Sequence, residues 1–169
     1  MSAEAQRAPR VENEERLQRA LELAHAYLNR RERTVAEVRR QLERRGIAAP
    51  TVEAAIFLLT DQGYLDDPRF AALFVSDKRE LEQWGNERIR RGLVARGIEL
   101  ELAEQALASS HDGQGQETEL ERALALLRRR FPVAPADPRE RQRALGVLLR
   151  KGYETELALD ALAAHARDR

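Results

Sequence analysis

The chain has 169 residues, with 29 basic and 29 acidic side chains, so its formal net charge is zero. Charged residues make up 34% of it, above the roughly 25% usual in globular proteins. Leu, Ala, Arg and Glu are abundant, which favours helices because straight side chains lose little entropy there. The absence of cysteine excludes a disulfide framework and a thiolate metal site. No apolar run reaches the ~18 residues of a membrane span and no signal-peptide core follows Met1, so we expect a cytoplasmic protein without membrane association.

The N-terminal part of the chain predicts two helices after an irregular start. Residues 1–13 show no periodicity, and we expect a flexible segment there. An amphipathic pattern begins at Glu14 and predicts the first helix. Thr34 followed by Glu37 is typical of a capping box, so a second helix begins at this point. It should end at Gly46, because glycine readily takes the positive φ of the position after a helix.

A third helix is predicted from about Thr51 to Gly63, followed by the stretch YLDDPRF. Asp67 and Pro68 suit the N-cap and first position of a fourth helix. We interpret the stretch as a structural joint between repeats. Its residues are Gly63, Tyr64, Leu65, Asp66, Asp67 and Phe70.

Further helices are predicted in the second half of the chain. Asn86 is expected to cap a fifth helix, which Gly97 ends, and a sixth helix follows. Residues 109–116, SSHDGQGQ, read as a linker. A seventh helix from Glu117 to about Arg130 comes next.

The last two helices are also marked by their ends. Asp137 and Pro138 have the pattern of an N-cap and first position, so an eighth helix starts there. Gly152 should end it, and a ninth helix is expected from about Thr155 into the C-terminus.

Three ten-residue segments align without gaps, which indicates an internal repeat. They are VRRQLERRGI (38–47), IRRGLVARGI (89–98) and ALGVLLRKGY (144–153). Each has an apolar first residue, a leucine fifth and a glycine ninth. Since one such unit is too small to bury its own apolar faces, neighbouring units must stack. The predicted fold is all-α, with three tandem three-helix repeats in an elongated, curved array. The predicted parts are a flexible N-terminus (1–13), repeats at 14–63, 64–108 and 117–169, and the linker (109–116).

No catalytic constellation is present in the sequence. His25, His111 and His165 lie in separate segments, and none has a second ligand four residues away, so no metal site is predicted. Asp66 and Asp67 are adjacent, and their side chains diverge, whereas paired acid–base chemistry needs convergent carboxylates. We therefore expect a protein that is not an enzyme and that needs no cofactor.

Basic residues gather on the middle helix of each repeat, and acidic residues gather elsewhere. The apolar stripes turn inward, so the adjacent arginines should point outward and contact a partner. An ordinary solvated helix face is the alternative. The predicted partner-binding residues are Arg39, Arg40, Arg44, Arg90, Arg91, Arg96, Arg139 and Arg143.

Three motifs, taken in order, resemble the RecX family of regulators of the RecA recombinase. GYLDDPRFAALFV (63–75) is similar to the family's G-Y-[LI]-[DN]-D-x-x-[FY]-A. The stretch from Trp84 through IRRGLVARGI, and RRERTVAEVRRQLERRGI (30–47), are similar to two further family motifs. Together they cover residues 24–107 well, while the third repeat matches more loosely.

The resemblance implies a partner and a function. A member of this family is expected to bind RecA and its filament on single-stranded DNA, and to inhibit strand exchange and ATP hydrolysis in the regulation of homologous recombination, DNA repair and the SOS response. We expect a monomer with, at most, weak direct DNA binding. Two alternatives stay open: a helix-turn-helix-like DNA-binding regulator, because RTVAEVRRQLERRG also fits a short recognition helix, and a plain adaptor scaffold.

Overall fold

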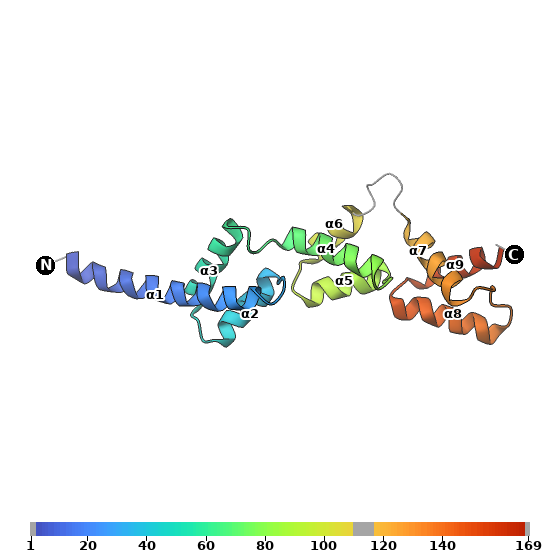
Figure 1. Cartoon of the computed structure of the whole chain (residues 1–169), viewed down its shortest axis with the longest axis horizontal. Coiled ribbons are helices and arrows are strands. Elements are labelled where there is room, and N and C mark those ends of the chain that lie inside the picture. Colours follow the sequence, from blue (N-terminus) through green and yellow to red (C-terminus); the bar gives the residue numbers. More distant parts are fainter. Residues whose placement is uncertain (1–2, 110–116, 168–169) are drawn as a thin grey trace. The chain divides into compact units, whose positions relative to one another are not determined.

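The computed structural model describes residues 3–109 and 117–167, with side chains from residue 12 onward. Within these ranges the chain forms nine helices and no strand, which confirms the all-α prediction (Figure 1). The helices are α1 (Ala3–Leu28), α2 (Val35–Arg44), α3 (Ala49–Asp61), α4 (Asp67–Glu80), α5 (Asn86–Ala95), α6 (Leu100–Ser109), α7 (Glu119–Arg130), α8 (Pro138–Lys151) and α9 (Thr155–Arg167). No described helix combines the length and the apolar character that crossing a bilayer requires.

The observed helices differ from the predicted ones at the start of α1 and at the end of α6. α1 begins at Ala3, well before Glu14, because the alanine, glutamate, glutamine and arginine residues of 3–13 favour helix, although Pro9 opposes it and the segment carries no apolar stripe. Of the predicted linker, Ser109 ends α6. The rest of that linker, residues 110–116, lies outside the described part of the chain.

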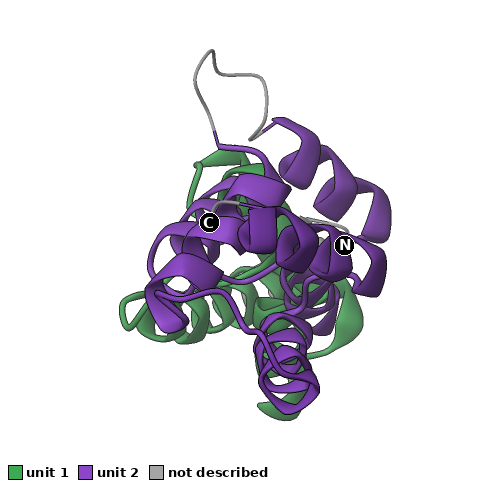
Figure 2. Cartoon of the chain, turned by 90° about the vertical axis from the view of Figure 1, so that its right-hand side faces the viewer, with its two compact units in different colours: residues 1–70, 96–98 green, residues 71–95, 99–169 purple. Residues whose placement is uncertain are grey.

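The chain divides into two compact units, which Figure 2 colours separately. Unit 1 contains residues 1–70 and 96–98, and unit 2 contains residues 71–95 and 99–169. The core of unit 1 lies among α1, α2 and α3 and includes the fully buried Leu42 and Leu59.

Two groups of buried side chains lie in unit 2. The first comes from α4, α5 and α6 and includes Val75, Ile89 and Leu93. The second lies among α7, α8 and α9 and includes Leu126 and Leu148. Each set of three successive helices therefore buries apolar side chains of its own.

The three glycines of the repeat occupy equivalent helix ends, as the sequence predicts. Gly46, Gly97 and Gly152 follow α2, α5 and α8 with φ values of +75°, +87° and +88°. An L side chain rarely adopts this conformation, so all three positions favour glycine. Gly97 and Gly152 are also restricted by space, since an added Cβ would overlap Cβ of Ala36 and of Arg88, respectively.

The GYLDD stretch lies within unit 1, and its Leu65 is part of the core of that unit. Leu65 is buried, and Phe70 is nearly so, whereas Tyr64 is exposed and meets the ring of His25 edge to face at 4.8 Å. The predicted cap is wrong by one residue. Asp66, rather than Asp67, caps α4, because its carboxylate accepts a hydrogen bond from the backbone N–H of Arg69 at 2.9 Å.

The carboxylate of Asp67 accepts a hydrogen bond from a different helix. Asp67 Oδ1 accepts a hydrogen bond from the N–H of Val35, the first residue of α2, at 2.9 Å. It thereby satisfies a backbone donor at the start of a helix from the same unit. Burial raises the pKa of Asp67 above its usual value, and this outweighs the opposing effect of that hydrogen bond.

The two aspartates should respond differently to substitution. Asp66→Ala is expected to lower the free energy of unfolding by about 1 kcal/mol, because α4 loses its cap. Asp67→Asn keeps an acceptor for Val35 and removes a charge that burial disfavours. A raised pKa means that the folded state binds the proton more tightly, so stability is lost as pH rises through that pKa. The stability of Asp67→Asn relative to the parent should therefore increase from about pH 4 to pH 7, measured by urea unfolding. A pH-independent difference would contradict this assignment.

Candidate interaction surface

Two of the predicted partner-binding arginines are held within their own repeat. Arg39 donates from Nε and Nη2 to the two carboxylate oxygens of Glu53 on α3, at 2.8 and 3.1 Å. Arg90, at the equivalent position of α5, pairs with Glu104 on α6 and with Glu87. The hydrogen bonds to Glu53 and Glu104 raise the pKa of Arg39 and of Arg90. These arginines link the second and third helices of a repeat, and their guanidinium groups are already engaged.

Arg40 and Arg96 lie together in unit 1, around the short segment 96–98. The carbonyl oxygen of Arg96 accepts hydrogen bonds from Oγ1 of Thr34 at 2.7 Å and from Nη2 of Arg40 at 3.3 Å. The Arg96 side chain lies 3.8 Å from the carboxylate of Glu37. Its guanidinium also lies above the ring of Phe70 at 5.4 Å. The segment is thus fixed on the N-terminal turn of α2, and Arg40 contributes to fixing it.

A matching joint occurs inside unit 2, between α5 and the end of α8. The N–H of Gly85 donates to the carbonyl of Lys151, and Nη1 of Arg88 donates to the carbonyl of Arg150, both at 2.9 Å. Gly85 is equivalent to Thr34 in the repeat alignment, and Lys151 is equivalent to Arg96. The two units therefore join equivalent positions, with the Thr34 hydroxyl as the donor in unit 1 and the Gly85 backbone N–H as the donor in unit 2.

The other four predicted residues are exposed helix-surface arginines. Arg44 lies on α2 in unit 1, and Arg91, Arg139 and Arg143 belong to unit 2. Arg139 and Arg143 are one turn apart on α8, and Arg150 lies two turns beyond Arg143 on the same side of the helix. The eight predicted residues are thus four from each unit, and only some of them are available to a partner.

Unit 2 contains a groove that brings arginines from two helices together. The groove has a volume of about 520 Å³ and is lined by Trp84, Arg88, Arg91, Gly92, Leu149 and Arg150. We call it the Trp84 groove. α5 and α8 supply its arginines, and the joint between these helices brings them close together.

The chemistry of the Trp84 groove is cationic and aromatic. The Arg88 guanidinium lies over the indole of Trp84 at 4.1 Å, and Nζ of Lys78 approaches the same ring at 4.8 Å. Arg91 has 68% of its side chain exposed, and it makes a 3.3 Å pair with Glu87. None of the six lining residues has a carboxylate. Such a groove can bind a carboxylate or a phosphate, since guanidinium groups pair with either.

Sequence reasoning placed only Arg91 in the predicted set for this groove. In the repeat alignment Arg150 is equivalent to Arg44 and Arg88 is equivalent to Arg143, so repetition alone does not separate the arginines that line the groove from those that do not. Trp84 is the only tryptophan of the chain, and it directly precedes a buried glycine. A single tryptophan directly before Gly85 was the feature of the sequence that could have indicated this groove.

The histidines within the described ranges are not part of a metal site. His165 is buried on α9, where Nε2 lies 2.8 Å from the carbonyl oxygen of Phe131. His111 falls outside the described ranges. Over residues 12–109 and 117–167, no three His, Asp or Glu side chains are grouped closely enough to hold a metal ion.

These observations define a tandem array of three-helix domains with an arginine-rich groove. Residues 20–56, 66–107 and 117–162 match, in that order, the first, second and third three-helix domains of RecX. The chain belongs to the RecX family.

Similar proteins from other organisms agree with this membership. The regulatory protein RecX of Xanthomonas axonopodis pv. citri is 38% identical over 149 residues, which is 88% of this chain and 86% of that protein. The regulatory protein RecX of Trichlorobacter lovleyi is 37% identical over 134 residues, covering 77% and 84% of the two chains. The crystal structure of RecX from Lactobacillus salivarius has the same fold, with a TM-score of 0.76 over 92% of this chain and 99% of that one, at 21% identity. The Xanthomonas and Trichlorobacter relatives are named as regulatory proteins.

Proposed function

We propose that this protein binds the RecA recombinase, chiefly as the filament on single-stranded DNA, and inhibits its strand exchange and ATP hydrolysis. This would place it in the cytoplasm, as a regulator of homologous recombination, DNA repair and the SOS response that acts without catalytic chemistry. Membership of the RecX family is the observation that carries the proposal.

The Trp84 groove is the surface that we assign to the contact. A filament of protein on DNA presents both acidic side chains and phosphates, and the guanidinium groups of the groove can pair with both. Arg139 and Arg143 extend the same basic face along α8. Several modest contacts on one chain add to firm binding, because each contact raises the effective concentration of the next.

The direct test is the ATPase of RecA on single-stranded DNA, followed with and without this protein. We expect hydrolysis to fall when the protein is present at a small fraction of the RecA concentration. The effect should require an assembled filament, so RecA monomers without DNA should bind more weakly. Unchanged hydrolysis at equimolar protein would contradict the proposal.

One observation favours a second candidate, direct binding of DNA. The Trp84 groove combines an aromatic ring with three arginines and no lining carboxylate, which also suits a nucleotide strand. A direct DNA binder would bind single-stranded DNA without RecA, and its affinity would fall steeply with salt. Fluorescence anisotropy of labelled DNA at two salt concentrations separates this candidate from the filament proposal.

A further inference from the structure

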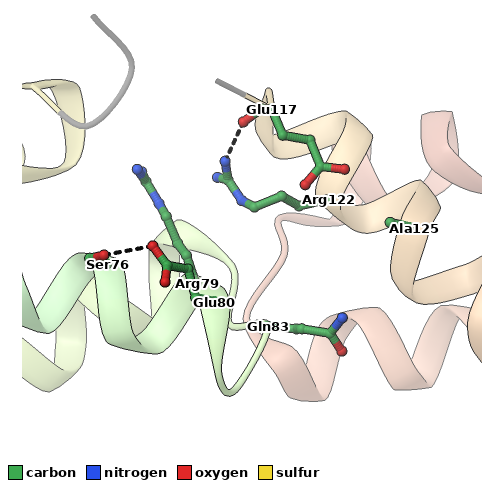
Figure 3. Close-up of a pocket in the computed structure, with 7 residues that line it drawn as sticks. All are labelled: Ser76, Arg79, Glu80, Gln83, Glu117, Arg122 and Ala125. Carbon is green, nitrogen blue, oxygen red and sulfur yellow. Dashed lines mark hydrogen bonds between the residues drawn. The ribbon is translucent and has the colours of Figure 1, made fainter. Parts of the chain in front are cut away.

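A second pocket in unit 2 lies between α4 and α7, and its wall contains two arginines. It has a volume of about 350 Å³ and is lined by Ser76, Arg79, Glu80, Gln83, Glu117, Arg122 and Ala125 (Figure 3). Figure 3 shows Arg79 extending from α4 and Arg122 extending from α7 into the space between these helices. This pocket shares no lining residue with the Trp84 groove, and the function proposed above does not use it.

Arg79 is a buried cation with an incomplete set of partners. The residue is only 8% exposed. Its Nη2 donates to Oδ1 of Asn86 at 3.0 Å and to the carbonyl of Leu107 at 3.1 Å, while its buried Nε has no acceptor. Asn86 was expected to cap α5, but its amide bridges Arg79 and the carboxylate of Glu119 instead. These bonds position the Arg79 side chain and leave one donor unused.

Arg122 has even fewer partners for its donors. Its Nη1 donates to the carbonyl of Glu117 at 2.6 Å, whereas its buried Nε and Nη2 have no acceptor. Within the described ranges, neither Arg79 nor Arg122 forms an ion pair with a carboxylate. A buried donor without an acceptor is destabilising, and more so when it is charged. Three such nitrogens on two cations lack an acceptor, and protein atoms cover all three of them in this structure.

The two cations also disfavour each other. Burial, followed by the positive charge of Arg122, lowers the pKa of Arg79 to about 10. An anion placed between the guanidinium groups would offset this repulsion, and it would accept the unused hydrogen bonds when the guanidinium groups turn their covered donors toward it. The pocket therefore places two guanidinium groups beside one space that a small oxyanion can enter, with the carboxylates of Glu80 and Glu117 also in its wall.

We propose that the pocket between α4 and α7 binds one phosphate group, held by Arg79 and Arg122. The guanidinium groups come from two helices, so their free donors do not belong to one planar fork. A tetrahedral phosphate presents oxygens in several directions, whereas a carboxylate pairs best with one coplanar guanidinium. The volume exceeds what a free phosphate needs and is within the range of small-molecule pockets, which leaves room for the remainder of a phosphate monoester.

Two glutamates in the wall of the pocket limit how much negative charge a ligand can carry. Glu80, which accepts a hydrogen bond from the Ser76 hydroxyl at 2.8 Å, and Glu117 both lie in the wall. Two carboxylates next to the site repel an extended polyanion. The pocket should accept a single phosphate group and reject a triphosphate or a DNA strand. This inference does not depend on RecA being the partner.

The test is titration of the full chain with inorganic phosphate and, separately, with a nucleoside monophosphate, using calorimetry and thermal unfolding. Both ligands should bind and raise Tm, because a ligand that binds only the folded state stabilises it. Tighter binding of the monophosphate would identify a phosphate monoester as the ligand, and equal binding would identify free phosphate. Single-stranded DNA should not displace either ligand.

The variant for this test is Arg122→Gln, which leaves Arg79 and its bonds in place. It should weaken phosphate binding by about tenfold or more, a difference of about 1.4 kcal/mol or more. Without ligand, it should be as stable as the parent, since the repulsion is removed. Arg91→Gln, an equal loss of charge outside the pocket, should bind phosphate normally. Absence of phosphate binding, equal stabilisation by acetate, or full binding by Arg122→Gln would each overturn the proposal.

Discussion

Replacing Gly85 by Ala should lower the free energy of unfolding by about 3 kcal/mol, the upper end of the usual overpacking cost. Gly85 lacks a positive φ, so the cost is one of space alone. An added Cβ would lie 2.5 Å from the carbonyl carbon of Gly152 and 2.5 Å from the nitrogen of Tyr153. Both atoms belong to the backbone, so they cannot rotate away. The joint between α5 and α8 must open to accommodate the methyl group.

A matched substitution on the neighbouring helix gives the control. At Gly146 in α8, an added Cβ would lie 3.1 Å from Nη1 of Arg150, the mobile end of a long side chain. Gly146→Ala should therefore be neutral or stabilising by up to about 1 kcal/mol, because alanine favours a helix interior. Urea unfolding of the parent and both variants measures the difference. If Gly85→Ala were as stable as Gly146→Ala, the close backbone packing would not hold.

The double variant Arg91→Glu, Arg150→Glu should lose most of the proposed inhibition of the RecA ATPase. Both side chains line the Trp84 groove, and both residues are exposed, so reversal converts attraction into repulsion with little effect on packing. The half-inhibitory concentration should rise by about tenfold or more at low salt, which corresponds to roughly 1.4 kcal/mol of lost binding. The difference should shrink at high salt, because screening weakens the attraction in the parent as well.

Arg90 is not included in the double variant. Reversing Arg90 would break its pair with Glu104 on α6, so a loss of activity could reflect damage to the repeat, whereas among the described residues Arg91 pairs only with Glu87 on its own helix. The control is Arg30→Glu, Arg31→Glu, an equal change of charge at exposed positions after α1. This control should inhibit as the parent does. If the Arg91, Arg150 variant stayed helical by circular dichroism and still inhibited normally, the contact would lie elsewhere on the protein.

Local signals in the sequence determined most of the fold. The capping box at Thr34 and Glu37 and the Asp137–Pro138 start of α8 form as predicted, because each depends on residues within one helical turn. The glycines after α2, α5 and α8 take positive φ for the same local reason. The segment of α1 before Glu14 was missed, since its helix-forming composition has no apolar stripe to reveal it.

Long-range contacts determined which polar side chains face solvent. The repeat pattern treats Arg90 and Arg91 alike, yet Arg90 pairs with Glu104 on the next helix, whereas Arg91 is exposed and pairs with Glu87 on its own helix. Asp66 and Asp67 are both plausible caps, and the choice depends on Asp67 meeting α2 across the core. Such choices need the spatial positions of residues that are far apart in the chain, which periodicity does not contain.

The sequence by itself determined that this protein is an all-helical chain of three repeats in the RecX family, because helix signals are local and its motifs are specific. Only the tertiary structure decided which cations lie together. Packing of α5 against the end of α8 assembles the Trp84 groove, and packing of α4 beside α7 brings Arg79 and Arg122 to one pocket. The physical reason is that a guanidinium group becomes available to a ligand only when its own chain leaves its donors unpaired.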